Sequence, residues 1–248
     1  MRTRGSAARH ASSLSVRGPG ACHRRSTSLP GVKIDMDSGV AVVGLGDGLN
    51  AFDGEFVAAL GAALDEIEAD PDARAVVTTG GGKHYSNGYD LDYLGSLAGD
   101  ELGDFLDRSR RVLARVLAFP LPTAAALNGH AFGIGAMLAL AHDQRVARRD
   151  RGWFCLPEID LGMQFSPFML ALITARLGER GAHEAILTGR RYDAAGAREL
   201  GIAHADADEA DLVATATALV QPFTGKDRTM AAQLKRDLYA SVLAGLDG

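Results

Sequence analysis

The sequence is poor in cysteine, tryptophan and lysine, with two Cys, one Trp and four Lys among its 248 residues. Cys22 and Cys155 lie far apart and cannot form the disulfide framework of a small secreted protein, so a reducing compartment fits best. No apolar run approaches the roughly 18 residues that a membrane-spanning helix needs. His, Cys, Asp and Glu nowhere show metal-ligand spacing. We therefore expect neither a membrane span nor a metal site.

Acidic residues are absent from the first 33 positions, which hold seven of the 26 Lys and Arg. The formal net charge of −5 therefore conceals an acidic body, in which 19 basic residues oppose all 31 Asp and Glu and leave −12. Such a body repels phosphate backbones, so a nucleic-acid partner has no electrostatic support.

Residues 1–33 are rich in Arg, Ser, Gly and Pro and show no apolar periodicity, so they cannot bury enough surface to fold alone. The composition resembles an organellar transit peptide; the alternative is a start placed too far upstream, with Met36 as the true first residue. We predict that residues 1–35 are a disordered basic leader or a misassigned start. Residues 36–248 then form one domain. The expected location is cytoplasmic, or an organellar matrix if the leader is genuine.

Beyond this leader the apolar pattern is that of a layered α/β protein. Residues 40–45 and 73–79 are predicted to be buried strands. Between them, Asp53 is a suitable N-cap for a helix that ends at Asp70 and Pro71. The helix has one apolar stripe, formed by Phe56, Leu60, Leu64 and Ile67.

The rest of the chain continues the alternation. A polar glycine-rich loop over residues 80–88 precedes a predicted helix at 100–117 and a strand at 123–127. An almost wholly apolar helix then begins near Gly133 and ends at His142, which predicts that it is buried. Short strands are expected at 145–148 and 153–155. From about residue 166 the chain is predicted to be mainly helical.

Gly44, Gly46 and Gly48 follow the first apolar strand and superficially match a dinucleotide-binding loop. The spacing fails, because Leu49 stands where the third glycine should be and the helix opens only after Phe52. A tight turn is the preferred interpretation. An NAD oxidoreductase stays as an outside alternative that cofactor titration would test.

Three segments, in this order and spacing, carry the functional prediction: residues 85–91 (YSNGYDL), 128–135 (NGHAFGIG) and 156–162 (LPEIDLG). Together with Ala141-His-Asp143 they resemble the crotonase (enoyl-CoA hydratase/isomerase) superfamily, from about Gly39 to the C-terminus. The resemblance implies an α/β fold built as a crotonase (ClpP-like) spiral of ββα units with C-terminal helices. It also implies an acyl-CoA substrate, no cofactor beyond the coenzyme A of that substrate, and a homotrimer or hexamer.

Enolate chemistry on a thioester needs preorganised donors for the oxygen that gains charge. The resemblance implies that these donors are the backbone N–H groups of Tyr89 and Ile134. The second placement is also physically reasonable, because the first N–H groups of a helix have no partners and its dipole favours negative charge. The residues expected to bind substrate are Ser86, Asn87, Gly88, Asp90, Leu91, Gly133 and Phe165.

Glu158 is the predicted catalytic acid/base. Hydratases of the family use two glutamates, and here the first is replaced by Met137 while the second matches Glu158. Apolar neighbours Leu156 and Ile159 are expected to desolvate Glu158 and raise its pKa. One carboxylate suits a proton shuttle, so the resemblance is closest to the single-glutamate Δ3-Δ2-enoyl-CoA isomerases. The alternatives are hydration or another thioester reaction on the same scaffold, and a non-catalytic acyl-CoA-binding module.

Several neighbouring residues have less specific expectations. Asp160 would share the side of Glu158 if the segment were extended, and is interpreted as a structural neighbour. His84 and Tyr85 border the glycine loop and could help to position a ligand. His130 and His142 are expected to be hydrogen-bonded core residues. Acyl chain length would depend on how four side chains pack: Leu94, Phe132, Phe165 and Phe168.

Overall fold

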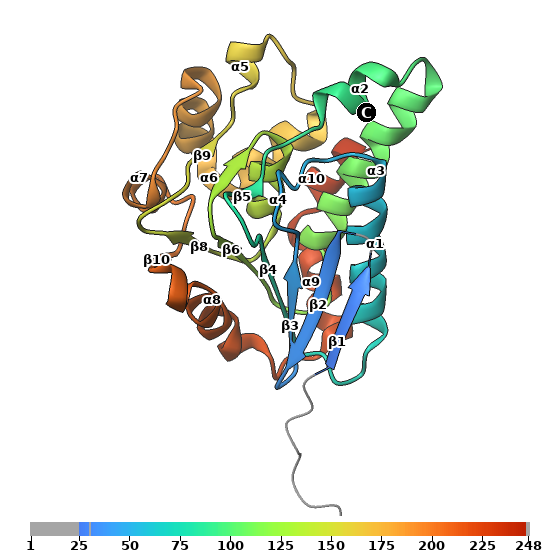
Figure 1. The fold of residues 1–248 in the computed structure, drawn as a ribbon, viewed down its shortest axis with the longest axis vertical. Helices are drawn as coiled ribbons and strands as arrows, with labels where there is room; N and C mark the ends of the chain where they lie inside the picture. The colour runs from blue at the N-terminus through green and yellow to red at the C-terminus, as the bar shows by residue number, and fades with distance from the viewer. Residues whose placement is uncertain (1–24, 30, 247–248) are drawn as a thin grey trace, which may run out of the picture.

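The computed structural model describes residues 25–29 and 31–246, and within them the chain forms two β-sheets flanked by α-helices (Figure 1). The larger sheet has the strand order β1-β2-β3-β4-β6-β8-β10. Its pairs β1–β2 and β2–β3 are antiparallel, and the others are parallel. Its strands are β1 (Arg25–Leu29), β2 (Val32–Asp37), β3 (Val40–Gly44), β4 (Ala75–Thr79), β6 (Thr123–Leu127), β8 (Gln144–Arg148) and β10 (Ala205–Ala207).

The smaller sheet is parallel and pairs β5 (His84–Ser86), β7 (His130–Phe132) and β9 (Phe154–Cys155). Each of its strands directly follows a strand of the larger sheet and precedes a helix. The helices that close these three units are α2 (Leu91–Ser96) with α3 (Asp100–Leu117), α4 (Ile134–Ala141) and α5 (Glu158–Leu161). This repetition confirms the expected spiral of ββα units.

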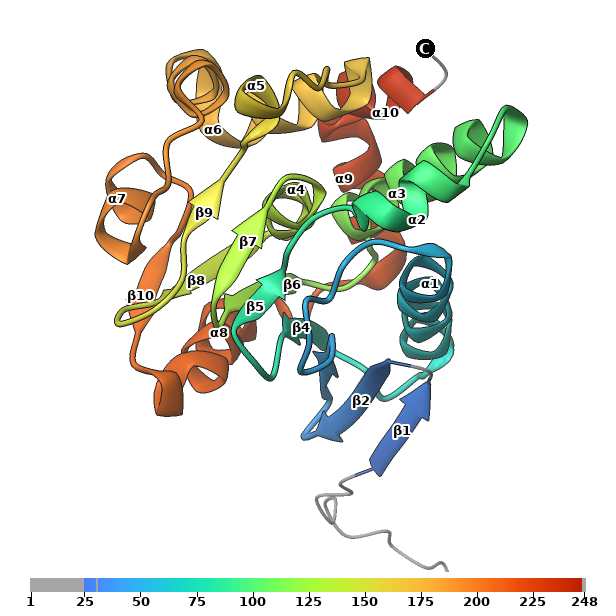
Figure 2. The same cartoon turned by 45° about the horizontal axis from the view of Figure 1, so that its top comes forward.

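Helix α1 (Gly54–Ala69) begins as predicted, because the Asp53 side chain accepts a hydrogen bond from the Phe56 N–H at 2.7 Å. Its apolar stripe is buried against the core that α1, α3 and α4 form on one face of the larger sheet. The opposite face is covered by α8 (Leu212–Val220). Figures 1 and 2 show α8 and α1 on opposite sides of this sheet. The layered arrangement places both ends of α4 inside the protein.

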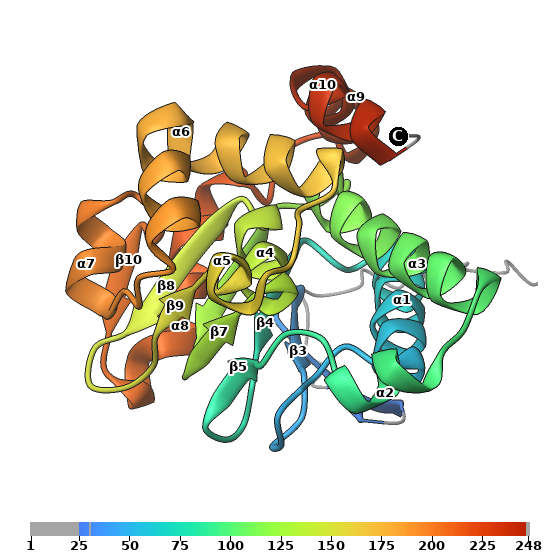
Figure 3. The same ribbon diagram turned by 90° about the horizontal axis from the view of Figure 1, so that it is seen from above.

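From Pro167 onward the regular elements are helices apart from β10, which pairs with β8 at the edge of the larger sheet. The helices are α6 (Pro167–Thr188), α7 (Ala194–Glu199), α8, α9 (Arg228–Leu238) and α10 (Ala240–Leu243). The C-terminal helix α10 packs against α6 and is followed back along the chain by α9 (Figure 3). In the described part of the chain, no helix has the length and apolar character needed to cross a membrane.

The structure corrects the boundary predicted for the leader. Residues 25–29 and 32–35 belong to β1 and β2 of the larger sheet, and the Arg25 guanidinium reaches Asp70 at the end of α1 at 2.9 Å. Val32, Ile34 and Met36 alternate with polar residues and are buried, so a chain starting at Met36 would lack β1 and most of β2. The composition of the basic segment concealed this period-two pattern. The leader prediction for residues 1–24 and 30 lies outside the described residues.

Candidate active site

The loop after β5 turns at Gly88, whose φ of +92° favours glycine. Phe52 donates its N–H to the Gly88 carbonyl (2.8 Å) and accepts from the Asp90 N–H (3.1 Å). Since these two bonds flank Tyr89, the N–H of Tyr89 faces away from Phe52, and it has no hydrogen-bond acceptor among the described residues. Asp90 then caps α2 through its side chain, which accepts from the Tyr93 N–H.

Helix α4 begins next to this loop. Gly133 is its N-cap, with φ of +52°, and the N–H of Gly133 donates to the Cys155 carbonyl of β9 (3.1 Å). The N–H of Ile134 is the first of the helix and therefore has no intrahelical acceptor. Among the described residues it has no other hydrogen-bond acceptor either. All eight residues of α4 are buried, as its apolar sequence predicted.

The two segments are in close contact, and glycines make this possible. A Cβ on Gly88 would lie 2.9 Å from the Phe132 carbonyl oxygen, directly before α4. A Cβ on Gly135 would lie 2.5 Å from Ser86 Oγ, directly before the loop. No larger residue therefore fits at either position unless the backbone moves. The free N–H groups of Tyr89 and Ile134 thus belong to two segments that pack directly on each other.

Glu158 is the first residue of α5, which corrects the extended conformation assumed for this segment. Helical geometry turns Asp160 to solvent, so it does not share the side of Glu158. The Glu158 side chain is buried, with a residue exposure of 7%, and its Oε2 atom has no hydrogen-bond partner among the described residues. Burial raises the pKa of Glu158 to about 7, as its apolar neighbours led us to expect. A carboxyl with this pKa can both accept and release a proton near neutral pH.

A cavity of about 430 Å³ brings these groups together. Eight of the residues predicted for the site line it: Asn87, Gly88, Tyr89, Asp90, Leu91, Gly133, Ile134 and Glu158. Asp90 and Asp92 also contribute carboxylates, but Glu158 is the buried one of the three. The cavity therefore presents one desolvated carboxylate beside two segments with unpaired N–H groups.

Two predicted substrate-binding residues lie elsewhere. Ser86 is fully buried behind the loop, where its hydroxyl donates to the Asn50 carbonyl (2.7 Å) and accepts from the Gly88 N–H (3.4 Å). It shapes the loop and does not line the cavity. Phe165 packs against the main core instead of lining the cavity. Of the residues considered for acyl chain length, Phe132 lines the cavity, whereas Phe168 is fully buried and Leu94 packs on the core.

Sequence reasoning missed several lining residues, among them Leu49, Ala51, Leu161 and Met163. Leu49, Leu161 and Met163 are large apolar side chains with exposures of 53%, 56% and 39%. In the sequence each of them is an apolar residue beside a glycine in a turn. This pattern does not indicate a binding site unless the segment that it faces is known. Apolar walls of this kind suit a hydrocarbon chain.

Tyr85 has a structural role in place of the ligand-positioning role considered above. Its hydroxyl lies 2.7 Å from Thr78 Oγ1, which lies 3.0 Å from His142 Nε2, and His142 Nδ1 lies 2.8 Å from the Leu138 carbonyl. Since a carbonyl only accepts, Nδ1 carries the proton and Nε2 accepts from Thr78. Burial lowers the pKa of His142 to about 4, so the ring is neutral at pH 7.

This chain of hydrogen bonds ties β4, β5 and α4 together and confirms His142 as a bonded core residue. His130 differs from that expectation, because its Nδ1 atom is buried without a partner among the described residues.

Comparison with known proteins identifies the family. The model of the enoyl-CoA hydratase/isomerase family matches residues 35–245. The chain belongs to this family. The peroxisomal enoyl-CoA delta isomerase 2 of Arabidopsis thaliana is 34% identical over 180 residues, which cover 68% of this chain and 75% of that protein. Curated delta isomerases and the family match together support an enzyme of the enoyl-CoA isomerase/hydratase type.

Solved structures of the family have the same fold. An enoyl-CoA isomerase of Mycobacterium tuberculosis aligns with a TM-score of 0.79 and 28% identity, covering 88% of this chain and 96% of that one. An enoyl-CoA hydratase of Shewanella pealeana aligns with a TM-score of 0.75 and 26% identity, covering 86% and 81%. The enoyl-CoA hydratase/isomerase family therefore accounts for the two-sheet spiral, while its members include both kinds of enzyme.

Proposed function

We propose that this member of the family is a Δ3-Δ2-enoyl-CoA isomerase. Glu158 removes a proton from C2 of a 3-enoyl-CoA, and the electron pair moves onto the thioester oxygen, which the N–H groups of Tyr89 and Ile134 hold. The electron pair then moves back from the oxygen through the dienolate. Glu158 delivers its proton to C4, and the double bond forms between C2 and C3. Atoms and electrons balance within one substrate molecule, so the reaction needs neither a redox cofactor nor an added water.

The observation that carries this proposal is the single buried carboxylate in the cavity. Its pKa of about 7 matches the requirement that one group acts first as base and then as acid. The two unpaired N–H groups are fixed before substrate arrives, which is the arrangement that stabilises an enolate most effectively. The apolar residues around the cavity would accept the acyl chain.

Hydration is the second candidate, because the family includes hydratases. A water that adds across the double bond needs two groups to hold and activate it. Glu158 matches one of the two hydratase glutamates, and the place of the other is taken by Met137, a buried residue of α4 that is absent from the cavity lining. This replacement favours isomerisation over hydration.

The test is to incubate the full-length protein with 3-hexenoyl-CoA and 2-hexenoyl-CoA in parallel and to identify the products by mass spectrometry and chromatography. We expect 3-hexenoyl-CoA to become 2-hexenoyl-CoA, with 3-hydroxyhexanoyl-CoA absent or formed much more slowly. A substrate deuterated at C2 should carry part of its label to C4, because one carboxyl moves the proton. Rapid hydration of 2-hexenoyl-CoA would instead favour the second candidate. We retain the homotrimer or hexamer as a prediction that light scattering can check.

A further inference from the structure

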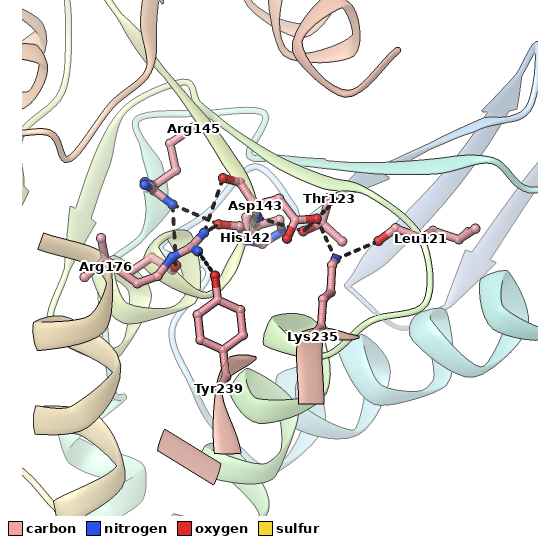
Figure 4. Close-up of polar contacts among 9 residues, drawn as sticks. Leu121, Thr123, His142, Asp143, Arg145, Arg176, Lys235 and Tyr239 are labelled. Carbon is pink, nitrogen blue, oxygen red and sulfur yellow. Dashed lines mark hydrogen bonds and ion pairs between the residues drawn. The ribbon is translucent and has the colours of Figure 1, made fainter. Parts of the chain in front are cut away.

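The C-terminal end of α4, opposite the end that carries Ile134, is held by two arginines. Arg176 of α6 donates through Nε to the Leu140 carbonyl (2.8 Å) and through Nη2 to the carbonyls of His142 and Asp143 (Figure 4). Arg145 of β8 also donates to the His142 carbonyl (2.8 Å). The last carbonyls of a helix have no intrahelical donors and carry its negative pole, so cations satisfy them well.

The C-terminal helix α9 reaches the same point through two side chains. Tyr239, its C-cap, accepts a hydrogen bond from Arg176 Nη1, and its ring centroid lies 5.5 Å from Arg176 Cζ. Lys235 pairs with Asp143 Oδ2 (2.6 Å) and donates to the Leu121 carbonyl (3.1 Å). Figure 4 shows both side chains converging on the segment that follows α4.

Polar contacts carry much of the attachment of α9. Ala232 is the buried residue of this helix, and Leu234 and Leu238 are exposed by 58% and 72%. A second cavity of about 550 Å³, lined by Arg176, Lys235 and Tyr239 among others, replaces close apolar packing at this point. The contacts of α9 with the end of α4 therefore run through Lys235 and, by way of Arg176, through Tyr239.

Helix α4 can transmit a displacement from one end to the other. It is a single buried segment of eight residues, about 12 Å long at 1.5 Å per residue. A shift of its C-terminal carbonyls therefore moves the N–H of Ile134, and donors at an oxyanion site act only within a narrow range of geometry.

We infer that Arg176 and Tyr239 are positioning residues for the oxyanion donor Ile134, so that docking of α9 is coupled to the active site through α4. The inference rests on the proposed function and adds two residues that position one of its oxyanion donors. Neither side chain lines the candidate active site, so both act through the helix.

The chain offers a matched control in Arg228, at the other end of α9. Its guanidinium donates to the carbonyls of Glu68 (2.8 Å) and Asp70 (3.0 Å) at the end of α1. Arg176 and Arg228 thus make the same kind of contact, but only Arg176 holds the end of α4.

The experiment compares Arg176→Gln, Arg176→Lys, Tyr239→Phe and Arg228→Gln in the full-length protein. It measures kcat and KM for 3-hexenoyl-CoA, the melting temperature, and the infrared carbonyl band of bound hexanoyl-CoA labelled with ¹³C at the thioester. We expect Arg176→Gln to lower kcat by about tenfold, less than the 10²–10³ cost of removing a donor outright. KM should change little. The infrared frequency of the bound thioester carbonyl should lie closer to the frequency of the free thioester in water. Arg176→Lys should recover part of the loss.

We expect Tyr239→Phe to change the band and kcat in the same direction by a smaller factor, and Arg228→Gln to retain the wild-type band with kcat within about twofold. The inference is overturned if Arg176→Gln and Arg228→Gln lower kcat equally with the wild-type band, or if Tyr239→Phe matches wild type in both measurements. Should Arg176→Gln fail to fold, the decision rests on Tyr239→Phe, which loses one hydroxyl only. A wild-type protein that neither binds nor converts acyl-CoA overturns the proposed function and this inference together.

Discussion

Gly133 and Glu158 meet at the centre of the site: a Cβ added to Gly133 would lie 3.3 Å from Glu158 Oε1. The two residues come from successive ββα units, one as the N-cap of α4 and the other as the first residue of α5. The carboxylate therefore lies directly against the segment that carries the Ile134 N–H. A proton donor and an oxyanion donor this close can act on neighbouring atoms of one thioester.

Replacing Gly133 by alanine should impair activity more than stability. A non-glycine residue at φ +52° and ψ −125° costs on the order of 1–3 kcal/mol, and the new methyl group would crowd the carboxylate. We expect kcat to fall by about 10²-fold or more, as for loss of an oxyanion donor. The control is Gly103→Ala in α3, where an added Cβ meets nothing within 4 Å and alanine favours the helix. Equal kcat in the two variants would contradict the assigned geometry.

Glu158→Gln should abolish most proton transfer while preserving the fold, because the side chains have the same shape. We expect kcat to fall by about 10²–10⁴. In the wild type, kcat/KM should rise with pH through about 7, since the free carboxylate is the base that begins the reaction. Steady-state rates from pH 5 to 9 provide the check.

The matched control for this substitution is Asp160→Asn, which makes the same chemical change two residues away on an exposed side chain. It should keep both the rate and the pH profile. A flat wild-type profile, or a Glu158→Gln variant of normal rate, would remove Glu158 from the mechanism.

Glu158→Gln should also stabilise the protein at alkaline pH. Burial raises the pKa of Glu158 from 4.5 to about 7, so between these values the folded state binds more protons than the unfolded state. The free energy of unfolding therefore falls as pH rises through this window, by on the order of 3 kcal/mol. Glutamine carries no charge, so Glu158→Gln should be more stable than wild type at pH 8 and show little gain at pH 4. Urea unfolding at both pH values measures the difference, and a gain that is equal at pH 4 and pH 8 would contradict the assignment.

Tyr89→Phe separates the backbone of Tyr89 from its side chain. The proposed donor is the N–H, which the substitution leaves in place, so kcat should stay within about twofold. The hydroxyl is buried and interacts with Ser109, so its removal should change the free energy of unfolding by no more than about 1 kcal/mol.

Tyr85→Phe is the contrasting variant, because that hydroxyl bonds Thr78 at 2.7 Å, and its loss should destabilise the fold by about 1–2 kcal/mol. Thermal unfolding compares the two. A large loss of activity in Tyr89→Phe would give the hydroxyl a catalytic role that the proposal lacks.

Local sequence patterns predicted elements whose signals are complete within a few residues. The helix at 100–117 and the strand at 123–127 lie where their periodicity placed them, and Asp53 caps α1 as expected. The prediction was wrong for residues 25–35, where basic composition outweighed a short alternation of buried and exposed side chains. It was also wrong for residues 158–161, because a one-turn helix has no periodicity to detect.

The sequence by itself determined the family, the two glycine segments, the lone glutamate and the apolar helix, because these depend on residue identity and spacing. Only the tertiary structure decided that Ser86 and Phe165 lie outside the cavity, that Leu49 and Leu161 line it, and that α9 contacts Asp143 just beyond the far end of α4. The physical reason is that exposure and contact between distant segments arise from packing. Packing brings together residues whose separation along the chain carries no signal.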